Sequence, residues 1–391
     1  MTSQPSIWQP PAIRSIEPGH RQATWAELFF DLIFVVAVAQ LAAFLLHNPT
    51  WRGVGIYTLV YLPVWLGWVF ASIYANRFDT DDLGQRLITF AQMLAVAAMA
   101  ASIAEETGLQ FAIAIAVFRL LVALSYARVR AAVPAARPIA NRTMSQMLVS
   151  AGIWIGSTFV EGNVRLAFWA VAILVELAVA FVPQWQRLLA SVPLHLGHLP
   201  ERFGLFVIIV LGETVLAVVV GVAEAEWAAT AAIFGAIGLT ISFSLWWIYF
   251  ETVTAEAMHH LGAFRPIGWI LAHAPLVMGI TALGVGVEIA VHFESGEQLH
   301  AADALILGGS LCTALLSLGL ISAADAVDSS RIGAFARRLP AAVLVFVVAL
   351  LPISAHAVIT ILAVITAAEA TYDVWASRTK VSVPVEGHSA T

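Results

Sequence analysis

Charged residues are scarce in this chain. Only 11% of its 391 residues are Asp, Glu, Lys or Arg, whereas 60% are hydrophobic. A soluble domain usually carries about 25% charged residues, so this chain has too few to cover a surface that faces water. The composition excludes an ordinary soluble protein and favours one whose surface faces lipid. The expected fold class is all-α, a polytopic bundle of transmembrane helices.

Cysteine is also scarce, and the common enzyme motifs are missing. Cys312 is the single cysteine and lies in an apolar run, so helix packing rather than a disulfide must hold the fold together. No basic stripe indicates a nucleic-acid partner, and His195 and His198 lack the rest of a zinc ligand set. The Walker, G-x-S-x-G and H-E-x-x-H motifs are missing. We therefore expect no enzymatic activity, no cofactor and no metal.

Twelve apolar runs are long enough to cross a bilayer, because about 20 helical residues at 1.5 Å each span a hydrocarbon core of about 30 Å. They fall at about 25–46, 54–75, 84–104, 108–127, 143–160, 165–182, 203–222, 227–250, 266–290, 302–321, 339–353 and 356–376. The last two are the least distinct, since only Pro352, Ser354 and His356 interrupt them. One kinked helix over 339–376 is the alternative.

Basic residues predict the orientation. If the N-terminus is inside, 16 of the 19 Lys and Arg residues lie in cytoplasmic segments, and only Arg52 and Arg165 lie in outer loops. This bias favours a bacterial inner (plasma) membrane protein with both ends in the cytoplasm. It also favours an even number of spans, because an odd number would place Arg378 and Lys380 outside.

The organisation expected is two six-helix halves. We predict a cytoplasmic tail over 1–24, a first half over 25–190, a second half over 191–377 and a tail over 378–391. Residues 26–42 align without gaps with 201–217, and Gln40 falls near Glu213. Transporters are often built from such repeats, although any two apolar helices look somewhat alike.

Ionisable residues inside spans mark candidate sites, because a charge at the bilayer centre costs about 2.5–3.5 kcal/mol on insertion scales. Glu213 is the first candidate. It lies 12 residues after Glu201, or about 18 Å along the helix, which places it near the middle of the membrane. It is either a proton or cation site or a structural partner of Arg119.

Two further sets of ionisable residues could likewise serve either an ion site or the structure. Glu27 and Asp31 share one helix face at i, i+4 and form either a helix cap or part of an ion site. Arg119 is deep in a span and needs an acidic partner, which Glu176 or Glu213 would supply.

An acidic loop follows the second span. Asp79, Asp81 and Asp82 lie within four positions, which suits either a divalent cation or a solvated cap for the next helix. The spacing is not that of an EF-hand, so the cap is favoured.

Three segments resemble one family. They are WAELFFDLIFVVAVAQLA at 25–42, YANRFDTDD at 74–82 and HLPERFGLFVIIVLGETVLA at 198–217. Together they are similar to the bacterial low temperature requirement A family. The resemblance implies an integral membrane protein associated by name with growth in the cold, and it supplies no molecular activity.

The first helix has a fainter similarity to the F-S-D helix of a class of non-canonical potassium channels, whose motif helix lines the pore. Phe29 and Asp31 match that motif, and Phe30 stands where it has Ser. In the second half, the register position of the Asp is held by Leu205 or Phe206.

Three functions are consistent with these features. The favoured one is a transporter or channel for a small ion or solute, with the lipid bilayer as the other partner. The second is a structural or cold-stress membrane component, and the third is a lipid-modifying enzyme that uses the acidic loop. The sequence leaves the oligomeric state open.

Overall fold

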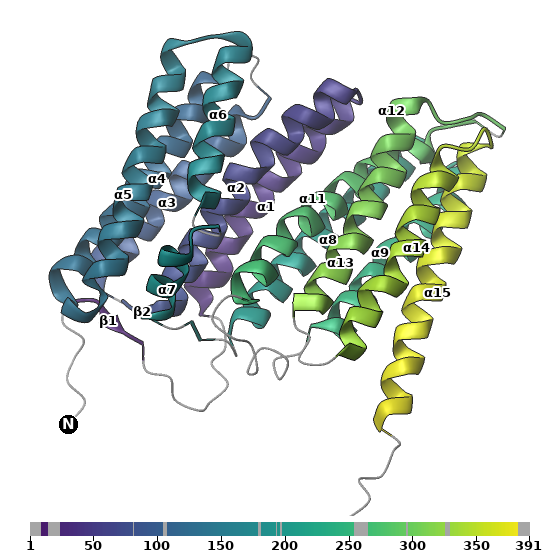
Figure 1. Cartoon of the computed structure of the whole chain (residues 1–391). Coiled ribbons are helices and arrows are strands. Elements are labelled where there is room, and N and C mark those ends of the chain that lie inside the picture. Colours follow the sequence, from purple (N-terminus) through teal and green to yellow (C-terminus); the bar gives the residue numbers. More distant parts are fainter. Residues whose placement is uncertain are drawn as a thin grey trace, which may run out of the picture. The chain divides into compact units, whose positions relative to one another are not determined.

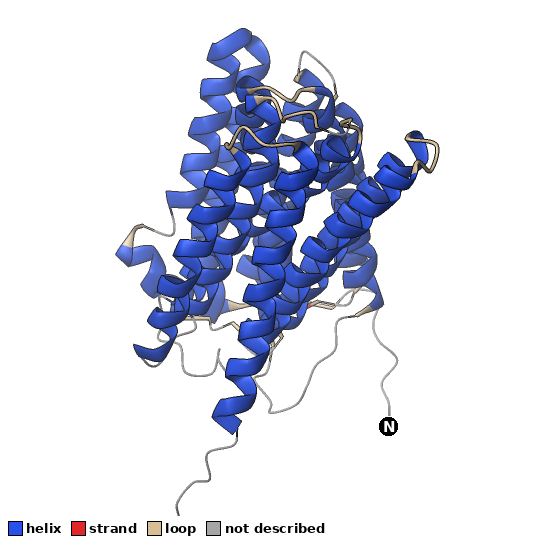
Figure 2. Cartoon of the chain, turned by 90° about the vertical axis from the view of Figure 1, so that its right-hand side faces the viewer, coloured by secondary structure: helices blue, strands red, loops and turns tan. Residues whose placement is uncertain are grey.

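The chain is almost entirely helical in its computed structural model, which confirms the predicted all-α fold (Figures 1 and 2). The structure describes residues 9–14, 24–80, 82–104, 108–178, 181–192, 194–195, 198–253, 265–294, 296–324 and 329–381. These residues form two compact units. The first comprises residues 1–213 and 255–274, and the second comprises residues 214–254 and 275–391. The predicted boundary at residue 190 does not separate these units, and the two-repeat organisation stays a prediction.

The first unit is a helix bundle in which helices that follow one another in sequence pack together. For example, α4 packs between α3 and α5 (Figure 1). Its helices are α1 (Trp25–His47), α2 (Trp51–Arg77), α3 (Leu83–Ser102), α4 (Leu109–Ala132), α5 (Arg137–Gly156), α6 (Gly162–Leu177) and α7 (Pro183–Ala190). The first parts of α8 (Leu199–Glu224) and α11 (Arg265–Val291) complete it.

The second unit contains the remaining parts of α8 and α11. Its other helices are α9 (Ala229–Thr252), α12 (Ala301–Ala304), α13 (Ser310–Ala324), α14 (Ser329–Ala349) and α15 (Ala355–Val381). A π-helical segment, Leu305–Gly309, joins α12 to α13. Gly286 of α11 lies against it, and a Cβ at Gly286 would stand 2.7 Å from the Cα of Leu307. A small residue therefore permits this close helix contact.

Each of the twelve predicted runs overlaps a helix. Among the described residues, nine helices are long and apolar enough to cross a membrane, with α12, the π-helical segment and α13 counted as one. The three that miss this criterion are α5, α6 and α14; α6, for example, has only 16 residues. The chain is a multi-pass membrane protein, and a count of twelve spans stays a prediction.

Residues 339–376, where the two predicted spans were least distinct, belong to two helices rather than one kinked helix. The chain leaves helical geometry between Ala349 and Ala355, around Pro352. The segment just before α12 contacts this turn through two hydrogen bonds. The Ala355 amide donates to the Glu297 carbonyl at 2.8 Å, and the Gln298 side chain donates to the Pro352 carbonyl at 3.1 Å. Proline lacks an amide donor and so favours such a break.

Part of the predicted N-terminal tail packs onto the first unit. Strand β1 (Ala12–Ile13) pairs antiparallel with β2 (Phe78–Asp79), which directly follows α2. Arg14 continues this contact through its amide, which donates to the Arg77 carbonyl at 3.0 Å. Its guanidinium pairs with Asp79 at 3.2 Å. Composition alone suggested only a polar tail, because the pairing depends on a loop more than 60 residues away.

Candidate functional site

The acidic loop after α2 is a cap and an ion-pair site. Asp82 is the N-cap of α3, where its carboxylate accepts hydrogen bonds from the Gly84 and Gln85 amides at 3.2 and 3.3 Å. It also pairs with Arg128 of α4 at 2.7 Å. Asp81 lies outside the described residues. Asp82 therefore caps α3 as predicted, but it is buried rather than solvated, and Asp79 is paired with Arg14.

Acidification is expected to remove the contribution of Asp82 to stability. Burial alone would raise the pKa of its carboxyl, but the hydrogen bonds from Arg128 and from the two amides outweigh burial, so the pKa lies below its ordinary value of about 3.9. A carboxyl with a depressed pKa in the folded state stabilises above its ordinary pKa, and this stability is lost as pH falls through the lowered value.

The test compares wild type with Asp82→Asn, which keeps a good N-cap and removes the charge. Thermal unfolding in detergent should show wild type more stable near pH 7 by about 1 kcal/mol. The difference should shrink below about pH 4. A difference that is unchanged at acid pH would contradict this account of Asp82.

Arg119 and Glu176 form a buried, nearly saturated ion pair. Neither side chain is exposed to solvent. The guanidinium donates from Nε and Nη2 to the two carboxylate oxygens at 2.6 and 2.9 Å, and Nη2 also donates to the Pro63 carbonyl at 2.8 Å. Ser150 donates to Glu176 at 2.5 Å. The pair joins α4 to α6, so Glu176, rather than Glu213, is the partner of Arg119.

A second buried ion pair joins α1 to α8. Asp31 Oδ1 accepts hydrogen bonds from Arg202 Nη2 and from the Trp68 indole, both at 2.8 Å. Arg202 Nη2 also lies 3.2 Å from the Ser72 hydroxyl. Asp31 and Arg202 are almost completely buried. Arg202 is thus the partner that explains why a carboxylate is tolerated one turn inside the first apolar helix.

This second pair is less saturated than the first. Asp31 Oδ2 and the Nε and Nη1 atoms of Arg202 make no hydrogen bond within the described part of the chain. Nη1 instead faces Glu27, whose Oε2 is 3.8 Å away. Buried polar groups are usually hydrogen-bonded, and exceptions often mark functional positions. The Asp31–Arg202 pair has three such atoms, whereas the Arg119–Glu176 pair has one, Nη1 of Arg119.

Glu27 has two roles at this position. It completes a capping box, because its carboxylate accepts from the Thr24 amide at 2.8 Å while the Thr24 hydroxyl accepts from the Glu27 amide. Its carboxylate also lies 3.8 Å from the guanidinium of Arg202 and 3.9 Å from the imidazole of His198. The cap interpretation is correct, and Glu27 additionally belongs to the Asp31–Arg202 cluster.

A cavity of about 730 Å³, here called the polar cavity, lies beside this cluster within the first unit. Glu27 and Arg202 line it, together with residues of α2, α3 and the loop between them. Its other lining side chains include charged residues of both signs and several aromatic rings: Arg14, Asp79, Arg86, Trp25, Phe29, Phe30, Phe70, Tyr74, Phe78 and Phe90. Arg202, the partner of Asp31, thus forms part of the wall of this cavity.

The remaining predicted site residues lie elsewhere. Glu213 is partly exposed on α8, and it makes no hydrogen bond or ion pair with any described residue. Gln40 is exposed on α1. Neither residue lines the polar cavity or the smaller cavity treated below. Their predicted roles in transport stay untested.

The second unit contains a charged cluster that the sequence did not indicate. Arg337 and Arg338 of α14 pair with Asp373 of α15, and Arg337 also pairs with Glu369 at 2.6 Å. Arg338 further donates to Ser322 and Thr252 at 2.8 and 2.9 Å. The i, i+4 spacing of Glu369 and Asp373 was the available signal for an acidic face.

Asn76 fixes the segment that leads into α8. Its side-chain amide donates to the His195 carbonyl at 3.1 Å, and its side-chain oxygen accepts from the His195 amide at 2.8 Å. Asn76 lies in the YANRFDTDD segment, and His195 lies just before the HLPERF segment. The YANRFDTDD segment therefore contacts the chain three residues before the third resemblance segment, 198–217, in which Arg202 lies.

Comparison with known proteins agrees with this geometry. The family model described as bacterial low temperature requirement A protein (LtrA) matches residues 22–370. The chain is also 29% identical over 306 residues to a protein of Rhizobium meliloti (strain 1021) that is described as uncharacterized, covering 73% of this chain and 74% of that protein. The family match includes all the residues of the Asp31–Arg202 cluster and extends through both units. The chain belongs to the bacterial low temperature requirement A family.

Proposed function

We propose that this protein is a channel or secondary transporter for a small ion or solute, and that the polar cavity is part of the path. One observation carries the proposal. The polar cavity, about 730 Å³ in volume, adjoins the Asp31–Arg202 pair, which is buried and incompletely hydrogen-bonded. Ionisable residues inside membrane helices are costly and commonly mark ion or proton pathways.

Asp31 is the proposed binding group. Its free oxygen suits a proton or a small cation, while Arg202 supplies the counter-charge when the site is empty. Glu27 lies at the cavity wall beside Arg202 and is proposed to attract the cation to this end of α1. Glu213 is a second proposed ion-binding group further along α8.

The proposed setting is the bacterial inner membrane with both chain ends in the cytoplasm, as the distribution of basic residues favours. The polar cavity is lined by Arg14 of the N-terminal segment and by Asp79 of the loop after α2. In this orientation both belong to the cytoplasmic side, so the path would begin there. The proposal assigns no catalytic step, cofactor or nucleic acid to the protein.

The test is ion flux in reconstituted vesicles. Wild-type protein is compared with Asp31→Asn under imposed proton and cation gradients, followed with fluorescent indicators. Removing a charged hydrogen-bond partner is worth about 1.5–3 kcal/mol, so we expect the flux to fall by roughly tenfold or more. Glu224→Gln is the matched control, because the Glu224 side chain is 63% exposed and lies outside the cavity. Equal flux in wild type and Asp31→Asn would overturn the proposed role.

A second candidate is a structural membrane component without transport. The nearly saturated Arg119–Glu176 pair favours it, since such a pair fixes α4 to α6. Wild-type vesicles whose fluxes all equal those of protein-free vesicles would support this alternative. A lipid-modifying enzyme is less favoured, because Asp79 and Asp82 are engaged by Arg14 and Arg128.

A further inference from the structure

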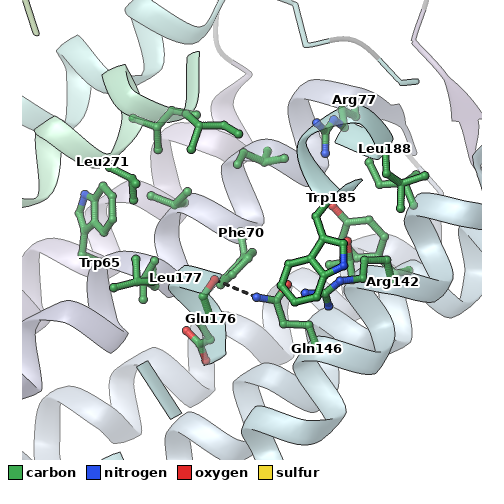
Figure 3. A pocket seen from close by; sticks show the side chains of 18 residues that line it. Trp65, Phe70, Arg77, Arg142, Gln146, Glu176, Leu177, Trp185, Leu188 and Leu271 are labelled. Atoms are coloured by element: carbon green, nitrogen blue, oxygen red, sulfur yellow. Dashed lines mark hydrogen bonds between the residues drawn. The ribbon is translucent and has the colours of Figure 1, made fainter. Parts of the chain in front are cut away.

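A second cavity, here called the Arg142 cavity, lies within the first unit next to α7. Its volume is about 90 Å³, and residues of α2, α5, α6, α7 and α11 line it (Figure 3). Figure 3 shows Arg77, Arg142 and Trp185 toward one end and Trp65 and Leu271 toward the other. The proposed transport path does not use this cavity.

The helix faces that line the cavity are amphipathic along their length. On α2, Trp65, Val69 and Ile73 follow one another at intervals of four residues, and Arg77 occupies the next position on the same face. Most other lining side chains are aliphatic or aromatic. The cavity therefore offers apolar walls over most of its length and guanidinium groups at one end.

The positive charge of Arg142 is uncompensated within the described part of the chain. Its guanidinium carbon lies 3.4 Å from the centre of the Trp185 ring, it forms no ion pair with a described residue, and its buried Nε has no hydrogen-bond partner. Stacking uses the face of the guanidinium and leaves its in-plane N–H groups available. The acid in the lining, Glu176, is already bound by Arg119 and Ser150.

We propose that the Arg142 cavity binds an anionic lipid, with the phosphate on Arg142 beside Arg77 and the start of an acyl chain along the apolar walls. Guanidinium groups suit phosphate oxygens through paired hydrogen bonds, and basic pockets between membrane helices are known to hold anionic head groups. An inorganic anion would use only one end of the cavity. An apolar cavity of about 150 Å³ accommodates benzene, so the smaller volume here suits a short stretch of acyl chain.

The experiment measures binding to delipidated protein in a neutral detergent. Dioctanoyl phosphatidylglycerol is titrated, and the thermal unfolding midpoint and native mass spectra are recorded. Dioctanoyl phosphatidylcholine and inorganic phosphate are the comparison ligands. The variants are Arg142→Gln, which removes the charge, and Leu271→Trp, which fills the apolar end. Arg130→Gln is the matched control, because Arg130 is exposed and does not line the cavity.

We expect phosphatidylglycerol to raise the unfolding midpoint saturably and to remain bound in the mass spectra, whereas the other two ligands do neither. Loss of one charged hydrogen-bonding group should weaken binding by roughly tenfold in Arg142→Gln and leave Arg130→Gln unchanged. If Leu271→Trp fails to fold, Arg142→Gln decides the question alone. Equal binding of phosphatidylcholine, wild-type affinity in Arg142→Gln, or stabilisation by phosphate alone would each overturn the proposal.

Discussion

Replacing Arg119 with methionine is expected to lower the free energy of unfolding by about 3–5 kcal/mol, the usual cost of leaving one charge of a buried pair without its partner. The carboxylate of Glu176 would then keep only the hydrogen bond from Ser150. The measurement is thermal unfolding in detergent followed by helical circular dichroism. This should be among the largest losses caused by any single substitution in the first unit.

The double variant Arg119→Met with Glu176→Leu separates pairing from packing. Replacing a whole buried ion pair with apolar side chains is often neutral, so the second change should restore most of the lost stability. Arg130→Met is the control, since Arg130 is exposed on the same helix. A double variant as unstable as Arg119→Met would contradict the assignment of Glu176 as the partner.

Replacing Arg202 with methionine is expected to have the next largest effect, about 3 kcal/mol, at the lower end of the range for buried pairs. The loss should be smaller than for Arg119 because the polar cavity lets water reach the position of Arg202. Asp31 would also keep its hydrogen bond from Trp68. Thermal unfolding under the same detergent conditions measures the loss.

Adding Asp31→Asn to Arg202→Met should recover stability, because the neutral amide removes the unpaired charge. The same double variant should remain unable to catalyse ion flux in vesicles. Recovery of stability without recovery of flux would separate the two roles of the pair. Recovery of both would show that Asp31 and Arg202 serve packing alone.

The sequence predicted the helices well because their signal is local. Apolar runs of the right length located the twelve long helical segments of the described residues, including the two that flank Pro352. Boundaries were less certain where polar residues begin a helix, as in α5, which starts at Arg137 rather than near residue 143. Helical geometry depends on residues within a turn or two, so the local run of apolar residues is enough to predict a membrane helix.

The partners of the charged residues were harder to predict because they are far apart in sequence. Arg119 could be placed next to Glu176 or Glu213 with equal logic, and the choice required the packing of α4 against α6. Arg202 was counted only as a basic residue at a membrane boundary, although its partner Asp31 is 171 positions away. No single-sequence pattern links these two positions, whereas the folded bundle brings them within hydrogen-bonding distance.

The two buried pairs of the first unit differ in their surroundings, and we propose a structural role for the pair of Arg119 and a transport role for the pair of Arg202. The pair of Arg119 has both carboxylate oxygens bound and adjoins the smaller Arg142 cavity, which Glu176 lines. The pair of Arg202 leaves one carboxylate oxygen unbound and adjoins the polar cavity. This contrast moves the functional emphasis from Glu213, the first candidate by depth in the membrane, to Asp31.

The most direct test of this account asks whether the polar cavity is on the solute path. Cys312 is the single cysteine, so Cys312→Ser provides a background without thiols. Thr89→Cys then places a thiol at the cavity wall, and Thr371→Cys places one at an exposed position on α15. A water-soluble methanethiosulfonate reagent should block most of the ion flux in Thr89→Cys vesicles and leave Thr371→Cys vesicles unchanged. Full labelling of Thr89→Cys, verified by mass spectrometry, with undiminished flux would contradict the account.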